Sequence, residues 1–142
     1  MPSSRSPRSA APSVASSATL IDLERLADAL GVHVATASLE PGYLGLYDAD
    51  HHAISLTLGL TPVERRCVLA HELGHAVHRH RTGSPSNERV ANAFAARLLV
   101  DPEALRHATM WTHEPWELAE ELDLTEDVVR DYLTLVAPAV RM

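Results

Sequence analysis

The sequence predicts an α+β fold, in which a small antiparallel three-stranded sheet packs on a mostly helical core. Three short runs rich in β-forming residues lie between residues 32 and 58, whereas residues 20–30 and most of the chain after residue 61 follow helical periods. With 142 residues and 46% hydrophobic content, the chain is long enough to bury one core. We therefore expect a single domain over residues 20–142, preceded by a tail.

The first 19 residues have the composition of a disordered tail, since they are rich in Ser, Ala, Pro and Arg and contain no acid. An Arg- and Ser-rich leader also resembles an organellar targeting peptide, and this alternative stays open. Residues 20–30 predict a first helix, because four leucines and Ala27 recur with a helical period and Gly31 follows them. Residues 32–38, 43–47 and 53–58 then predict the three strands, with turns between them.

The stretch His71-Glu72-Leu73-Gly74-His75 carries the strongest chemical signal. On a helix, residues four apart lie on one face, so both imidazoles point the same way, one turn apart. Two metal ligands are then in place, and Glu72 lies beside them, where it can accept a proton from water. A motif this short also arises by chance in a chain with 9 histidines, so its surroundings must decide.

The surroundings predict a well-defined helix over residues 62–80. Thr61 is a suitable N-cap, because proline follows it directly and glutamate stands three residues on. Basic residues fill the expected last turn, where the helix dipole favours positive charge. We expect His78 and His80 to interact with that dipole and not to bind metal.

Glu88 is the candidate third ligand, because a catalytic zinc site has three protein ligands and one open position. It opens a second helical segment, in which Ala91 and Ala95 share its side of the helix and allow a close approach. Asn92, one turn after Glu88, can hydrogen-bond a ligand from behind. In the alternative interpretation, Glu88 is a favourable first-turn acid and Asn92 a surface residue.

The residues that carry a family resemblance are His71-Glu-Leu-Gly-His75, then Glu88-x-x-Ala91-Asn92-x-Phe94-Ala95-x-x-Leu98-Leu99, and Pro102. Over residues 20–136 this pattern resembles the ImmA/IrrE family of zinc metallopeptidases. The resemblance implies zinc held by His71, His75 and Glu88, with Glu72 activating water. It also implies a protein substrate, a DNA-binding repressor of the helix-turn-helix class. The chain departs from the family pattern near Cys67 and before Pro102, but at no proposed ligand.

Tyr43 and Tyr47, in the predicted sheet, are candidate donors to the oxyanion of a tetrahedral intermediate. Tyrosine also suits a strand for its packing alone, so the structural interpretation stays open. The lone cysteine, Cys67, lies one turn before His71, and a fourth-ligand role competes with that of a small buried residue. One cysteine excludes an intrachain disulfide and favours a cytoplasmic protein. No apolar run approaches the roughly 18 residues that span a membrane.

Residues 101–142 carry ten acids and three arginines, so the entire net charge of −7 lies in the last part of the chain. Residues 114–136 predict two helices joined by a tight turn, which resembles a helix-turn-helix. The second helix begins with Glu126 and Asp127 and carries Asp131, whereas a DNA-binding helix needs basic residues that face phosphates. We therefore expect no direct nucleic acid binding and assign this region to packing or to docking of a basic partner.

The sequence as a whole predicts a zinc-dependent metallo-endopeptidase of the cytoplasm. With the family resemblance, the expected substrate is a helix-turn-helix transcriptional repressor of a phage, mobile element or stress regulon. The alternative is a non-hydrolytic antirepressor that binds and sequesters such a repressor. The sequence leaves the oligomeric state open.

Overall fold

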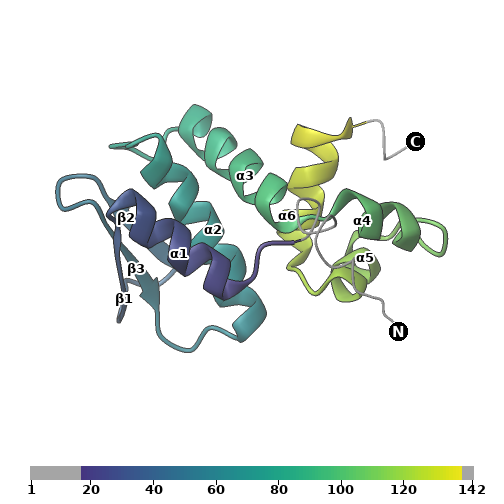
Figure 1. Cartoon of the computed structure of the whole chain (residues 1–142), viewed down its shortest axis with the longest axis horizontal. Helices are drawn as coiled ribbons and strands as arrows, with labels where there is room; N and C mark the ends of the chain where they lie inside the picture. The colour runs from purple at the N-terminus through teal and green to yellow at the C-terminus, as the bar shows by residue number, and fades with distance from the viewer. Residues whose placement is uncertain (1–16, 139–142) are drawn as a thin grey trace, which may run out of the picture.

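The computed structural model describes residues 17–138 and has the expected α+β composition (Figure 1). In chain order its elements are α1 (Leu20–Leu30), β1 (His33–Ala37), β2 (Gly45–Asp48), β3 (Ala53–Thr57), α2 (Pro62–Val77), α3 (Pro85–Leu99), α4 (Pro102–Ala108), α5 (Pro115–Leu122), α6 (Glu126–Asp131) and the π-helical η3 (Tyr132–Val136). Figure 1 shows α1 and the sheet at one end and α4 to α6 at the other, with α2 and α3 between them. None of the described helices combines the length and apolar character needed to cross a bilayer.

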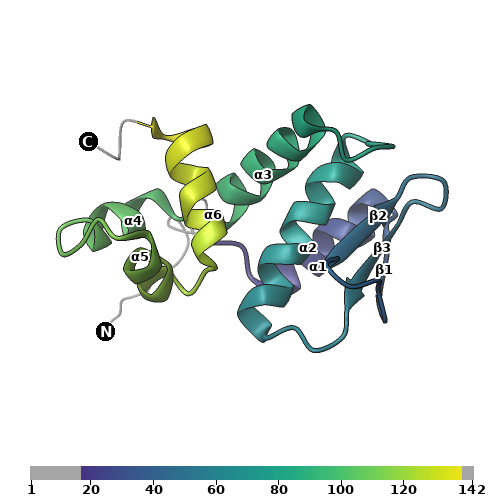
Figure 2. The same ribbon diagram turned by 180° about the vertical axis from the view of Figure 1, so that it is seen from behind.

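The sheet is mixed, and the prediction of an antiparallel sheet was wrong. Strand β3 is central and pairs with β1 in parallel and with β2 in antiparallel orientation. Ile54 and Leu56 of β3 are 1% and 0% exposed, so the strand that carries the core is bonded on both sides. Strand β2 is therefore an edge strand, and it packs beside α2 (Figure 2).

Helix α2 begins where the sequence predicts. The hydroxyl of Thr61 accepts a hydrogen bond from the backbone N–H of Glu64, and the Glu64 carboxylate accepts one from the N–H of Thr61. Thr19 caps α1 in the same way, because it and Asp22 form the same two hydrogen bonds between side chain and backbone. Both capping boxes satisfy N–H groups that the first turn of a helix leaves without partners.

Helix α2 ends at Val77, three residues before the predicted end at His80. Arg79 has a φ of 51°, in the left-handed region, and the chain reverses there. The N–H of His80 donates to the carbonyl of His75 (3.0 Å), and the N–H of Arg79 donates to that of Ala76 (3.1 Å). These are the two hydrogen bonds of a Schellman motif, which turns His80 back toward α2.

Helices α2 and α3 cross closely at Gly74. A Cβ atom on Gly74 would lie 2.9 Å from the Cα of Ala91 and 3.2 Å from the Cβ of Phe94. Ala91 and Ala95 are buried, as expected of small residues at a close helix contact. The short distance matters because Glu88, one turn before Ala91, must reach the histidines of α2.

Arg66 of α2 links the start of the described chain to the turn before α6. Its guanidinium donates to the hydroxyl of Ser17 (2.9 Å) and the carbonyl of Ala18 (3.0 Å), and also to the carbonyl of Asp123 before α6. The N–H of Ala18 in turn donates to the carbonyl of Leu98 at the end of α3 (2.9 Å). Residues 17–19 of the predicted tail are thus held against α2 and α3, while residues 1–16 lie outside the described residues.

Helices α5 and α6 occupy the predicted helix-turn-helix-like region. Asp123 ends α5 in the left-handed conformation, and Thr125 caps α6. Helix α6 has only 6 residues and passes directly into η3, and both pack against α3. The resemblance to a helix-turn-helix stays a prediction, whereas the packing on α3 brings α6 near Glu88.

Candidate metal centre

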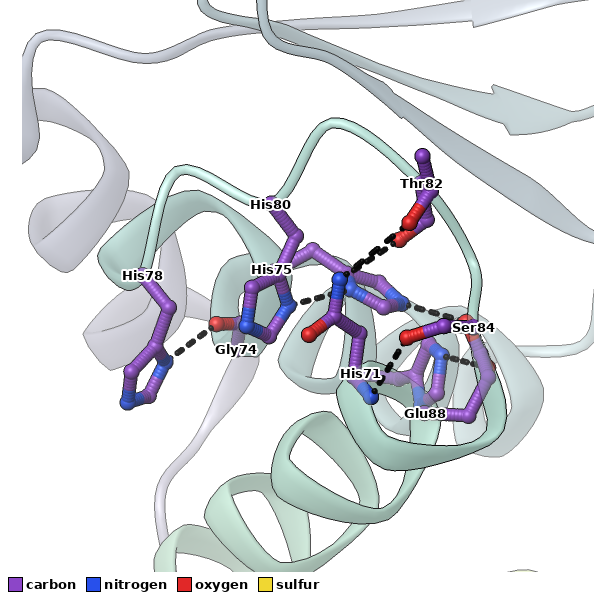
Figure 3. Close-up of polar contacts among 9 residues, drawn as sticks. His71, Gly74, His75, His78, His80, Thr82, Ser84 and Glu88 are labelled. Carbon is purple, nitrogen blue, oxygen red and sulfur yellow. Dashed lines mark hydrogen bonds and ion pairs between the residues drawn. The ribbon is translucent and has the colours of Figure 1, made fainter.

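Three side chains from two helices converge on one point. His71 and His75 lie one turn apart on α2, and Glu88 reaches them from the first turn of α3 (Figure 3). The Glu88 carboxylate lies 3.1 Å from Nε2 of His71 through Oε1 and 2.8 Å from Nε2 of His75 through Oε2. One ligand atom from each residue lies within 4.8 Å of the others. The three residues predicted as metal ligands are therefore brought together.

The donor set fits zinc. Two imidazole nitrogens and one carboxylate oxygen are donors that a catalytic zinc site uses, with one position left for water or substrate. Gly83 stands next to the carboxylate, and a Cβ on it would lie 3.2 Å from Oε2 of Glu88. Glycine at this position thus leaves the carboxylate free to approach the histidines, and a divalent cation is the natural partner of this site.

Glu72 lies beside the cluster and is buried, with 7% of its surface exposed. Burial, and after it the negative charge of Glu88, raises the pKa of Glu72 to about 7, while the backbone N–H of Tyr47 acts in the opposite direction. A cation held by the neighbouring ligands would act with Tyr47 and favour the carboxylate form. With a cation bound, Glu72 is therefore a carboxylate that can accept a proton from a neighbouring water.

The β2 edge strand lies directly against Glu72. A Cβ on Gly45 would meet Cγ1 of Val68 at 2.6 Å and Cγ of Glu72 at 3.0 Å, so only glycine allows this approach. The N–H of Thr57 donates to the carbonyl of Leu44 (2.9 Å). Because bonded and non-bonded pairs alternate in an antiparallel ladder, the next residue, Gly45, directs its backbone N–H and C=O toward the free edge.

Two hollows meet at the cluster. The larger, of about 690 Å³, extends toward α6, and the smaller, of about 420 Å³, extends toward residues 80–83. The residues that line both hollows are Tyr43, Gly45, His71, Glu72 and Glu88. The candidate centre is therefore open on two sides, and an extended chain can enter by one hollow and leave by the other.

The larger hollow is acidic where α6 lines it. Asp127 and Asp131 face it together with Glu126 and Glu64, and no arginine lines it. Glu126 is paired with an arginine of its own helix, whereas neither aspartate forms an ion pair within residues 17–138. Burial, and after it the charge of Asp127, raises the pKa of Asp131, which His71 opposes. A cationic side chain in this hollow would relieve that repulsion.

The two candidate oxyanion donors have different surroundings. The hydroxyl of Tyr47 lies 2.6 Å from Nδ1 of His52, whose Nε2 lies 3.0 Å from the carbonyl of Leu30. Nε2 must donate to a carbonyl, so Nδ1 accepts and the Tyr47 hydroxyl donates to His52. Tyr43 is 52% exposed and borders both hollows, so it is the better placed of the two for a substrate contact.

Asn92 and Cys67 both line the larger hollow. Within the described chain, no hydrogen bond joins Asn92 to a residue of the cluster, so its predicted role behind a ligand stays a prediction. Cys67 is buried and is not among the three converging ligands.

His80 is the contact that the sequence reasoning missed. Its Nδ1 lies 2.9 Å from Nδ1 of His75, on the opposite side of that ring from Glu88 (Figure 3). The expectation that His80 is a partner of the helix dipole and not a ligand assumed that α2 continues through residue 80. The reversal at Arg79 was not visible, because left-handed helix ends usually carry glycine.

Comparison with curated proteins found no matching sequence. A family model matches residues 27–134, more than two thirds of the chain, from within α1 to within η3. The match includes α2 and α3 and therefore all of the residues that converge at the candidate centre. The matched family is the IrrE N-terminal-like domain of the Peptidase_M78 group, and the chain belongs to it.

Proposed function

We propose that this protein is a zinc-dependent metallo-endopeptidase whose substrate is a helix-turn-helix repressor of a phage, mobile element or stress regulon. The observation that carries the proposal is the convergence of His71, His75 and Glu88 beside the buried Glu72, at a point open on two sides. Membership of a metallopeptidase family supports this chemistry.

Glu72 carries out the proton transfers. Zinc, when bound, polarises the scissile carbonyl and the attacking water. Glu72 takes a proton from the water as its oxygen bonds to the carbonyl carbon. The carbon–nitrogen bond then breaks, and Glu72 gives the same proton to the leaving nitrogen. Burial raises the pKa of Glu72 and the zinc ion would oppose that rise, so the carboxylate form that accepts the proton is favoured once the ion is bound.

The free edge of β2 supports binding of an extended substrate. Gly45 and Tyr47 alternate with the residues bonded to β3. The backbone N–H of Tyr47 is directed at the Glu72 carboxylate, so Gly45 offers the backbone groups that a further strand can bond. A peptide that adds to this edge places its own backbone beside Glu72. The chain has little surface beyond the groove for selecting a substrate, so cleavage depends on a target that exposes an extended linker.

The charge of the groove supports a basic partner. Asp127 and Asp131 line the larger hollow, and no arginine there neutralises them. Repressors that bind DNA carry basic surfaces, which an acidic groove attracts and orients. The same acidity opposes direct binding of this protein to nucleic acid.

Co-expression with a repressor encoded beside its gene tests the proposal. We expect a shorter repressor fragment with the wild-type protein and none with Glu72→Gln, which keeps the shape of the side chain but cannot take up the proton. Glu103→Gln, an exposed carboxylate on α4, is the matched control and should cleave like the wild type. Fragments that persist with Glu72→Gln would contradict the proposed mechanism.

The same experiment separates hydrolysis from sequestration. If the Glu72→Gln variant leaves the repressor intact but still relieves repression, the protein acts by binding alone. That outcome would favour the non-hydrolytic antirepressor and would leave the acidic groove as the functional surface.

A further inference from the structure

His75 is contacted through both of its ring nitrogens. Its Nε2 lies 2.8 Å from Glu88, and its Nδ1 lies 2.9 Å from Nδ1 of His80. The His75 residue is only 5% exposed. His80 thus supplies the second contact that fixes the plane of this ring.

His80 is itself held in place by its neighbours. The Schellman motif at Arg79 directs the backbone of residue 80 toward α2. The His80 ring stacks on that of His78, with centroids 5.2 Å apart and planes 17° apart. His78 in turn donates from Nδ1 to the carbonyl of Gly74 (2.8 Å), which anchors the stack to α2 (Figure 3).

The contact between two Nδ1 atoms requires one proton between them. A histidine that binds a cation through Nε2 keeps that nitrogen free of hydrogen, so its proton is on Nδ1. Nδ1 of His75 then donates, and Nδ1 of His80 must accept, which leaves the His80 proton on Nε2. The partner of His75 is therefore a neutral imidazole, where metal-binding histidines often have a carboxylate or a backbone carbonyl.

We propose that His80 is a positioning residue, which holds His75 in the orientation and tautomer that bind the cation. The proposal rests on the metal site of the proposed function, but it does not require that the protein hydrolyse peptides. It assigns to the reversal after α2 a task beyond ending the helix. The loop from residue 78 to 80 supports the ligand from behind.

Metal affinity of the full-length protein tests this role. We expect His80→Ala to weaken Zn²⁺ binding about 10- to 100-fold in a chelator competition, as loss of the partner behind a ligand generally does. His80→Asn should recover most of the affinity, because its side-chain oxygen is as many bonds from Cα as Nδ1 is. His80→Gln places its oxygen one bond farther away and should not recover it.

His107→Ala is the matched control, since it removes an exposed imidazole from α4. It should bind Zn²⁺ like the wild type. Should His80→Ala fail to fold, the comparison of His80→Asn with His80→Gln decides by itself. Equal affinity of these two variants, or wild-type affinity of His80→Ala, would overturn the positioning role.

Cobalt substitution distinguishes positioning from direct ligation. We expect the visible Co²⁺ spectrum of His80→Asn to match that of the wild type, because the ligand set is unchanged. A spectrum that reports a changed coordination number would mean that His80 is itself a ligand, and the inference would be wrong. A wild-type protein that binds neither metal would instead overturn the proposed function together with this inference.

Discussion

Gly45 sets the distance between strand β2 and the glutamate of the motif. The two nearest side-chain atoms to a Cβ at this position would be Cγ1 of Val68, at 2.6 Å, and Cγ of Glu72, at 3.0 Å. Both belong to α2, so a larger residue must push the strand away from the helix or turn these side chains. The glycine thus holds together the two parts that the proposed reaction needs, a substrate edge and a base.

Gly45→Ala should therefore lower kcat/KM at least about 10-fold, since a misplacement of about 1 Å costs up to 100-fold. Zinc affinity should stay unchanged, because Gly45 touches none of the three ligands. Cleavage of a repressor-derived peptide and zinc titration measure the two effects. Leu58→Ala is the control, because Leu58 is 64% exposed and lines neither hollow. Equal activity of both variants would show that β2 can shift without consequence.

Asp131 makes the stability of the protein depend on pH. Burial, and after it Asp127, raises the pKa of Asp131 above its ordinary value of 3.8. Because this pKa is higher in the folded than in the unfolded state, the protonated carboxyl favours folding. Its contribution to stability is complete below the unfolded-state pKa and is lost as the pH rises through the folded-state pKa.

Asp131→Asn should thus make the metal-free protein more stable at neutral pH, with no gain below about pH 3.8. Urea unfolding at several pH values measures this difference. Glu24→Gln on the exposed face of α1 is the control and should show no such pH-dependent gain. A wild-type protein that is more stable than Asp131→Asn at pH 7 would contradict the assigned cause.

At the scale of elements, the crossing of α2 and α3 determines whether Glu88 reaches the histidines. The two helices approach closely at Gly74, inside the motif, where a Cβ would lie 2.9 Å from the Cα of Ala91. Backbone atoms cannot rotate aside as a flexible side chain can, so an added methyl group must separate the helices.

Gly74→Ala should destabilise the protein by about 1–3 kcal/mol through overpacking. Helix propensity alone predicts the opposite sign, a gain of about 1 kcal/mol. Chemical denaturation decides between the two, and zinc affinity should fall as Glu88 moves away. A more stable Gly74→Ala variant would show that the helices do not touch at this point.

The end of α2 carries a strained residue. Arg79 is in the left-handed region, at φ 51°, which costs a non-glycine residue roughly 1–2 kcal/mol. Arg79→Gly should relieve this strain and stabilise the metal-free protein by up to about 1 kcal/mol, after the entropy cost of glycine. Denaturant unfolding measures the gain, and Arg81→Gly, nearby but without a positive φ, should bring none. A clear loss of stability with Arg79→Gly would contradict the left-handed turn.

Local signals predicted the local elements well and the long-range ones poorly. The threonine caps, the proline at the start of α2 and the motif spacing all act within a few residues, and the structure has them. The order of the strands depends instead on which strand is buried most, and the neighbours of β3 cannot be inferred from turns alone. The end of α2 was misjudged because an arginine adopts a conformation that usually signals glycine.

The site was predictable to the same extent. Residue type and helical spacing identified His71, Glu72 and His75, and small residues on the next helix pointed to Glu88. The contacts of His80 and Asp131 arise from a chain reversal and from helices that fold back on α3. No periodic pattern near the motif indicates these contacts, so the sequence analysis placed His80 and Asp131 outside the site.

At the scale of the whole molecule, the groove is built from both ends of the fold. Strand β2 borders it from the sheet end, and α6 borders it from the helical end, while α2 and α3 between them carry the cluster (Figure 2). Arg66 of α2 donates to the carbonyl of Ala18, before α1, and to that of Asp123, before α6, and so connects the two ends of the fold. The acidic last part of the chain thereby becomes one wall of the candidate active site.

The central claim is that His71, His75 and Glu88 hold one zinc ion at the junction of these parts. Elemental analysis of the purified protein, beside Glu88→Ala and the groove variant Asp131→Ala, tests it most directly. We predict one zinc per chain in the wild type and in Asp131→Ala, and a loss of most of it in Glu88→Ala. A metal-free wild type, or zinc retained in full by Glu88→Ala, would contradict the claim.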